Sequence, residues 1–198
     1  MKQPVKVMFC ILVCFAAGCA TAPVTYEDPG SAQPLTTNFG FSDLNKVTAY
    51  MVNDMLSHPA TVEMTTKRRP LIYLSDFLNE TDQHVDTKSI ADSIQTQVLR
   101  SGRFRFTDTD TRKKRAEEIE YQNESGMVKK STAVARGQEI GAEYRVSGRL
   151  VSYVERTSTT LRRSYKFTMK LQNIQTGVIE WQNEVPISKQ QNRPLVGL

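Results

Sequence analysis

Apolar and polar residues alternate one by one along three consecutive segments in the last third of the chain. This period is typical of strands with one buried face, so we expect three antiparallel strands here. Gln175-Thr176-Gly177 is expected to form the turn between the last two, because glycine readily takes a positive φ. The apolar members of the alternation are Tyr144, Val146, Leu150, Val154, Tyr165, Phe167, Met169, Leu171, Ile179 and Trp181.

Helical spacing of apolar residues predicts two helices in the first half of the chain. The first begins near Ser42 and ends at His58-Pro59, and the second is capped by Asp86 or Thr87 and stopped by Ser101-Gly102. Each has an apolar stripe suited to packing on a sheet. The stripes are Leu44, Val47, Met51 and Met55 in the first helix, and Ile90, Ile94 and Val98 in the second.

The segments around these helices complete the predicted fold. The apolar run Leu71 to Leu74 is typical of a central strand covered on both faces. Asp76 to Asp86 is predicted to be a polar loop and Arg103 to Phe106 a short strand, and further helices are expected over Asp108 to Asn123 and Ser131 to Ile140. This order predicts an α/β fold with a mixed β-sheet flanked by helices.

The first residues have the pattern of an export signal. Lys2 and Lys6 precede an apolar run over Val7 to Ala17, far shorter than the roughly 20 residues that span a bilayer. Ala16-Ala17-Gly18-Cys19 resembles a bacterial lipobox, in which lipid is attached to the cysteine and the chain is cut before it. We therefore expect residues 1–18 to be a lipoprotein signal peptide and Cys19 to be lipidated. The alternative is an ordinary signal peptide with an incidental cysteine.

The residues after Cys19 suggest a tether and a location. Residues 19–40 contain scattered prolines and little apolar periodicity, so we expect a flexible tether before a single globular domain over residues 41–198. Fully stretched, this tether reaches roughly 75 Å, and as a coil about 25 Å. The sorting rule that accompanies the lipobox favours the outer membrane, facing the periplasm, because residue 20 is Ala rather than Asp. Stable anchoring needs two or more acyl chains.

Charge and motifs argue against catalysis. The whole chain has 26 Lys and Arg against 21 Asp and Glu, and its basic run Arg112 to Arg115 is better explained in an exported protein as a solvated helix face than as a nucleic-acid site. There is no Ser-x-x-Lys, no Gly-x-Ser-x-Gly and no phosphate-binding glycine loop. The two histidines, His58 and His84, have no Glu or Cys at ligand spacing. We expect no cofactor, no metal and no enzymatic activity.

The order of features resembles a known family. Behind the lipobox and tether come "LIYLSDFLNETDQHVDTKSIADSIQTQVLRSGRFRF", "EIGAEYRVSGRL" and "KFTMKLQNIQTGVIEWQNE". This arrangement, over about residues 41 to 188, is similar to the LpoB family of outer-membrane lipoproteins, activators of bifunctional penicillin-binding proteins. The resemblance implies a fold like the N-terminal domain of TolB. It also implies that the protein binds a small accessory domain of the synthase and thereby stimulates glycosyl transfer and crosslinking.

A binding protein without a small-molecule motif must act through its surface. Our candidate is the polar face of the last three strands and their connecting loop, since Arg and Tyr are favoured at interfaces. The candidate residues are Arg145, Arg149, Tyr153, Arg162, Arg163 and Lys166. The same face is alternatively only the solvated side of a half-buried sheet, or is covered by a helix. Lys166 and Lys170 are expected to lie on the same face of the sheet as Glu180 and Glu184.

A secretion channel is the alternative function. In this alternative, the chain is a relative of the curli secretion-channel lipoprotein, which looks like the same core fold. The curli protein assembles into an outer-membrane pore through extra barrel hairpins. Here the connection from Glu155 to Arg163 is polar and basic, which does not suit a lipid-facing hairpin. We therefore expect a monomeric activator.

Overall fold

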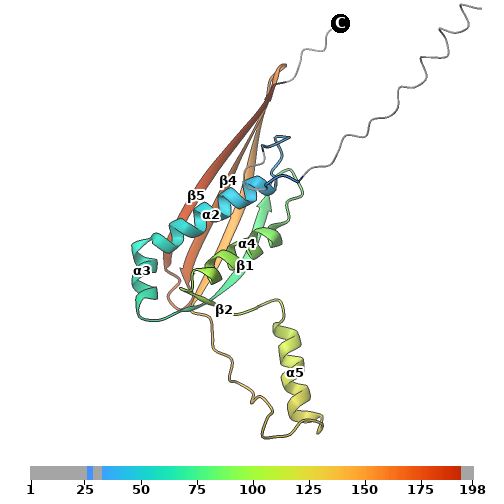
Figure 1. Ribbon diagram of the computed structural model, residues 1–198, viewed down its shortest axis with the longest axis vertical. Coiled ribbons are helices and arrows are strands. Elements are labelled where there is room, and N and C mark those ends of the chain that lie inside the picture. The colour runs from blue at the N-terminus through green and yellow to red at the C-terminus, as the bar shows by residue number, and fades with distance from the viewer. Residues whose placement is uncertain (1–25, 29–32, 193–198) are drawn as a thin grey trace, which may run out of the picture.

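The computed structural model describes residues 26–28 and 33–192. Cys19, the predicted signal peptide and part of the predicted tether lie outside the described residues. A five-stranded sheet with the order β2-β1-β3-β4-β5 forms the centre of the fold (Figure 1). β1 runs parallel to β2 and β3, whereas β3, β4 and β5 are antiparallel, so the predicted mixed α/β sheet is confirmed. The strands are β1 (Leu71–Glu80), β2 (Arg105–Phe106), β3 (Tyr144–Arg156), β4 (Thr160–Asn173) and β5 (Ile179–Asn192).

Two helices cover one face of this sheet. α2 (Phe41–Ser57) packs on β4 and β5, and α4 (Thr87–Arg100) packs beside it on β1. Both predicted apolar stripes are buried. Gly40 is the N-cap of α2, two residues before Ser42, near which the helix was expected to begin. Asp86, one of the two caps predicted for α4, accepts hydrogen bonds from the backbone of Lys88 and Ser89. α3 (Pro59–Thr66) follows α2 directly, with proline at the first helical position.

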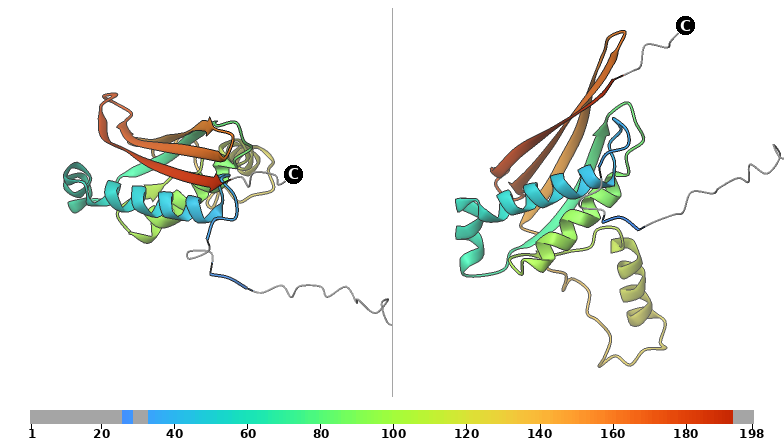
Figure 2. Two further views of the ribbon diagram at one scale, coloured as in Figure 1. Left: turned by 90° about the horizontal axis from the view of Figure 1, so that it is seen from above. Right: turned by 45° about the horizontal axis from the view of Figure 1, so that its top comes forward.

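The other face of the sheet is not covered by a helix in the part of the chain that the structure describes (Figure 2). The prediction that β1 is covered on both faces is therefore wrong. Leu71 is buried outside the main core cluster, whereas Ile72 lies in that cluster beneath the helices. We call this uncovered side of β1, β3, β4 and β5 the open face.

β1 is longer than its apolar run. The residues predicted as a polar loop from Asp76 continue the strand to Glu80, because β3 provides a parallel partner as far as Val151. A bulge between Leu74 and Phe77 returns Phe77 to the helix side, where its ring stacks on Phe167 with centroids 6.1 Å apart. Gly148 makes room for this ring, because a Cβ atom there would lie 2.5 Å from it.

Residues 108–142, which we call the arm, project from the lower end of the sheet (Figure 1). Its helix α5 (Arg112–Glu124) has no buried residue and contacts no other described helix or strand. The helix predicted over Ser131 to Ile140 is wrong, since this segment forms turns and coil. The Asn123 side chain donates a hydrogen bond of 2.9 Å to the Val134 carbonyl, and the Val134 N–H donates one of 3.0 Å to Gln122 Oε1, so these bonds tie the coil to α5 instead.

The residues just before α2 are packed against the domain. Thr37 is 5% exposed, and its carbonyl accepts a hydrogen bond of 3.0 Å from the Tyr165 hydroxyl. The Phe39 ring meets Tyr165 edge-on with centroids 5.5 Å apart. Residues 37–40, which the sequence assigns to the tether, therefore belong to the folded unit in this structure.

Candidate partner-binding surface

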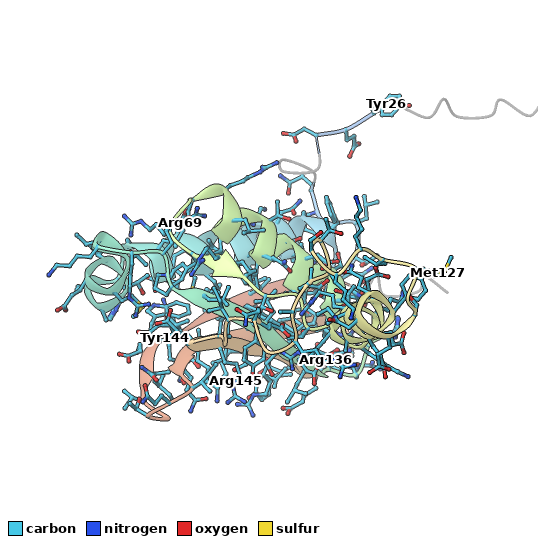
Figure 3. The ribbon with its side chains drawn as sticks, turned by 90° about the horizontal axis from the view of Figure 1, so that it is seen from below. Tyr26, Arg69, Met127, Arg136, Tyr144 and Arg145 are labelled. Carbon is cyan, nitrogen blue, oxygen red and sulfur yellow. The ribbon has the colours of Figure 1, made fainter. Side chains whose placement is uncertain are left out.

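The open face brings together most of the residues predicted as the binding surface. Arg145, Arg149 and Tyr153 extend from β3, and the antiparallel register with β4 adds Arg162 and Lys166 to the same side. Figure 3 shows Arg145 on the side of the sheet away from the helices. No described helix covers these side chains, so the alternative that a helix covers this face is wrong.

Arg163 does not belong to this surface. Because β4 alternates, Arg163 lies with Tyr165 on the helix side and is only 7% exposed. Its guanidinium donates to Asp82 Oδ2 and to Asn38 Oδ1, each at 3.0 Å. The predicted connection from Glu155 to Arg163 is mostly strand, because β3 continues to Arg156 and β4 begins at Thr160. Arg163 thus joins the segment before α2 to the β1–α4 loop.

Ion pairs orient the long side chains of the open face. Arg149 lies 3.6 Å from Glu80, and Lys166 lies 3.3 Å from Glu184. Arg162 lies 3.2 Å from Glu155, its cross-strand partner on β3. The pairs are partly or largely exposed, so each is worth no more than about 1 kcal/mol. They leave the charges available to a partner.

The predicted cross-strand pairing is only partly confirmed. Lys166 and Glu184 share the open face, but Lys170 lies opposite Gln182. The register shift next to Leu171 accounts for this difference, because it displaces Glu180 from the regular alternation of β5. Burial raises the pKa of Tyr144, and the negative charge of Glu180 adds to that increase.

A hollow of about 510 Å³ lies on the open face where β1, β3, β4 and β5 adjoin. Ser147 lies in its lining and is 9% exposed, and its Oγ atom has no hydrogen-bond partner. Such a buried hydroxyl without a partner costs about 1–3 kcal/mol. Lys170 is its cross-strand neighbour, and Arg145 and Arg149 lie two residues to either side along β3.

Three polar residues that line this hollow, Lys170, Ser147 and Glu80, are not among the predicted binding residues, although Lys170 was expected on this face. Lys170 continues the alternation that includes Lys166, so the period-two pattern was a sufficient signal for it. Ser147 follows the same alternation on β3, but nothing in the sequence distinguishes it from a serine that faces solvent. Glu80 was assigned to a loop, and only the long pairing of β1 with β3 brings it to the open face.

The described residues offer no obvious alternative chemistry. They contain no cluster of His, Cys, Asp and Glu suited to a metal ion. None of the helices in this part of the chain is long and apolar enough to cross a membrane.

Comparison with known families gives a match over most of the domain. The model of the family described as peptidoglycan-synthase activator LpoB matches residues 43–187. The chain belongs to the LpoB family. Comparison with curated protein sequences gives no significant match.

Solved LpoB structures are among the similar folds. The Escherichia coli LpoB C-terminal domain is 15% identical with a TM-score of 0.47, covering 74% of this chain and 99% of that one. The Salmonella enterica domain is 13% identical with a TM-score of 0.43, covering 73% and 98%. The NMR structure of E. coli LpoB is 15% identical with a TM-score of 0.40, covering 89% and 87%.

Proposed function

We propose that this chain is an outer-membrane lipoprotein that binds the accessory domain of a bifunctional penicillin-binding protein and activates peptidoglycan synthesis. The observation that supports it most directly is the family match over residues 43–187, which covers nearly all of the sheet and of the two helices packed on it. The chain acts as a regulator and not as an enzyme in this proposal. It needs no cofactor and acts as a monomer.

In this proposal, lipid on Cys19 attaches the chain to the outer membrane, and the domain lies in the periplasm. Because Thr37 is packed on the domain, the connecting segment is residues 20–36. Such a segment reaches at most about 60 Å when fully extended. The partner's accessory domain must therefore extend away from its own membrane to meet the open face.

The open face is the surface that we assign to the partner. Tyr153 is 60% exposed there, on the same face as Arg149 and Arg162, and aromatic and Arg side chains are favoured at interfaces. An uncovered sheet with such side chains suits a protein partner. The remaining alternative is that this face is simply solvated.

The test is the glycosyltransferase activity of the host's purified bifunctional penicillin-binding proteins, with and without the soluble chain from residue 20. We expect a severalfold increase with one synthase, which identifies the partner. A folded, monomeric chain that stimulates no synthase would overturn the proposal.

A pair of charge reversals tests the assigned surface. Arg149→Glu on the open face should weaken binding to that synthase by at least about tenfold without unfolding the domain. The matched control is Lys46→Glu, an exposed residue of α2 on the helix side, which should leave binding unchanged. Equal affinities for the two variants count against the open face, whatever the activation assay gives.

A further inference from the structure

We infer that the hollow on the open face binds a single carboxylate side chain of the partner synthase. This inference rests on the proposed function, because it names the group that the open face recognises. Four side chains define the carboxylate site: Ser147 in the lining, Lys170 across from it, and Arg145 and Arg149 to either side.

The unused donors at this position point to an acceptor. The Ser147 hydroxyl is buried without a partner, although a hydroxyl both donates and accepts. In the described part of the chain, Lys170 makes no hydrogen bond and no ion pair, and its ammonium group can only donate. A ligand that satisfies both must therefore accept hydrogen bonds, as a carboxylate does with two oxygens.

The surroundings limit the charge of the ligand. The lining contains three cations, Arg145, Arg149 and Lys170, but also the carboxylates of Asp76 and Glu80. The net positive charge of one matches a singly charged carboxylate. A doubly charged phosphate would meet the repulsion of the two acids. Acidic side chains on a protein surface have the required charge and reach.

The geometry of the sheet explains why the hollow persists. Small side chains at Ser75, Ser147 and Thr168 lie between longer ones. The guanidinium of Arg145 is held by a hydrogen bond to Gln172, and Arg149 is oriented toward Glu80 at 3.6 Å. These side chains are therefore partly preorganised at the rim, which reduces the entropy lost on binding.

The first experiment measures the affinity of the full-length chain, purified in detergent micelles, for the activated synthase by calorimetry. We expect Lys170→Ala to weaken binding by about tenfold and Ser147→Ala by at least about threefold. Ser147→Ala should leave the melting temperature unchanged or raise it, because it removes an unpaired buried hydroxyl. If Ser147 had only a structural role, the Ser147→Ala variant would not bind more weakly while it kept its melting temperature.

The matched control is Lys166→Ala, on the same strand and the same face. Its ammonium group already lies 3.3 Å from Glu184 and outside the hollow, so the loss of affinity should be several times smaller than for Lys170→Ala. If Lys170→Ala and Ser147→Ala bind like the wild type while the wild type still activates the synthase, the carboxylate site is overturned and the proposed function stands.

A second measurement does not depend on the synthase. N-acetylglutamate N-methylamide, which has one side-chain carboxylate, should shift the amide NMR signals of Ser147 and Lys170, and the glutamine analogue should not. Equal shifts with both probes, or none with either, would overturn the site. A wild-type chain that binds no synthase would overturn the proposed function and, with it, the assignment of the carboxylate to that partner.

Discussion

At the scale of single residues, Arg162 and Arg163 are adjacent in sequence but have different roles. Arg162 lies on the open face, about half exposed, beside Glu155. Arg163 is buried and bonded to Asp82 and Asn38. The alternation of a strand places neighbours on opposite faces, so a basic pair divides into one residue for the surface and one for the fold.

The two arginines should differ in their effect on stability. Arg163→Ala is expected to lower the free energy of unfolding by about 1.5–3 kcal/mol, because it removes two charge-assisted hydrogen bonds and the packing of a buried side chain. Arg162→Ala, as the matched control, should stay within about 0.5 kcal/mol. Urea denaturation of both variants measures the difference, and equal values would contradict the buried role of Arg163.

Glu143 provides a pH-dependent contact at the start of β3. Its carboxylate accepts a hydrogen bond of 2.6 Å from Arg68 and one of 3.3 Å from the backbone of Leu71. The hydrogen bond from Arg68 is the main reason that the pKa of Glu143 lies below its ordinary value of 4.5. A depressed carboxyl pKa stabilises the fold above the ordinary value, and this stability is lost as the pH falls through the depressed value.

Glu143→Gln should therefore reduce the melting temperature at pH 7 by about 2–4 °C. The gap to the wild type should shrink as the pH falls below 4.5, because the protonated wild-type side chain is also uncharged. Thermal unfolding at pH 7 and pH 3 measures this. Glu120→Gln, an exposed position on α5, is the control, and a gap at residue 143 that is independent of pH would contradict the assignment.

At the scale of elements, α5 differs from the other helices. It has no buried residue, and its first turn contains Arg112 to Arg115, whose positive charges oppose the helix dipole. Isolated helices of this length are marginal in water. Its ties to the coil of the arm, including an ion pair of 2.7 Å between Arg115 and Glu139, are therefore its main support in the described structure.

The arm should be dispensable for the stability of the domain. Its two ends leave the sheet near the same point, because Thr107 and Glu143 both donate backbone hydrogen bonds to the start of β1. Strands on either side of β1 lie about 10 Å apart, a gap that about six residues can span. Replacing residues 110–141 with a Gly-Ser linker should leave the melting temperature within about 3 °C of the wild type. A large decrease in circular dichroism melts would show that the arm supports the core.

At the scale of the whole molecule, the chain enters the domain on one side of the sheet, and the proposed recognition surface lies on the other. Residues 37–40 dock beside Tyr165 and Arg163 on the helix side, whereas the open face lies on the opposite side of the sheet. The chain therefore enters the domain on the side away from the proposed partner. This arrangement leaves the open face free of the connecting segment at its point of entry.

The proposed anchor has a direct test at this scale. Cys19→Ser should move nearly all of the protein from the membrane fraction to the soluble periplasmic fraction, because the thiol that accepts the lipid is lost. Cys10→Ser and Cys14→Ser, within the predicted signal peptide, are matched controls that should remain in the membrane fraction. Membrane retention of the Cys19 variant would overturn the lipid anchor.

The sequence by itself determined the elements whose burial follows a short period. The stripes of α2 and α4, the Asp86 cap and the alternation of β3 and β4 were all predictable, because each depends on residues within a few positions of one another. From these elements the mixed sheet followed, and so did the common face of Arg145, Arg149 and Lys166.

Only the tertiary structure decided what depends on partners distant in sequence. The extension of β1 to Glu80 requires β3, and its bulge requires the space beside Gly148. The uncovered face, the burial of Arg163 and the unpaired hydroxyl of Ser147 likewise arise from long-range packing. Local patterns show which residues can be buried, but the contacts between distant strands and helices decide which of them are.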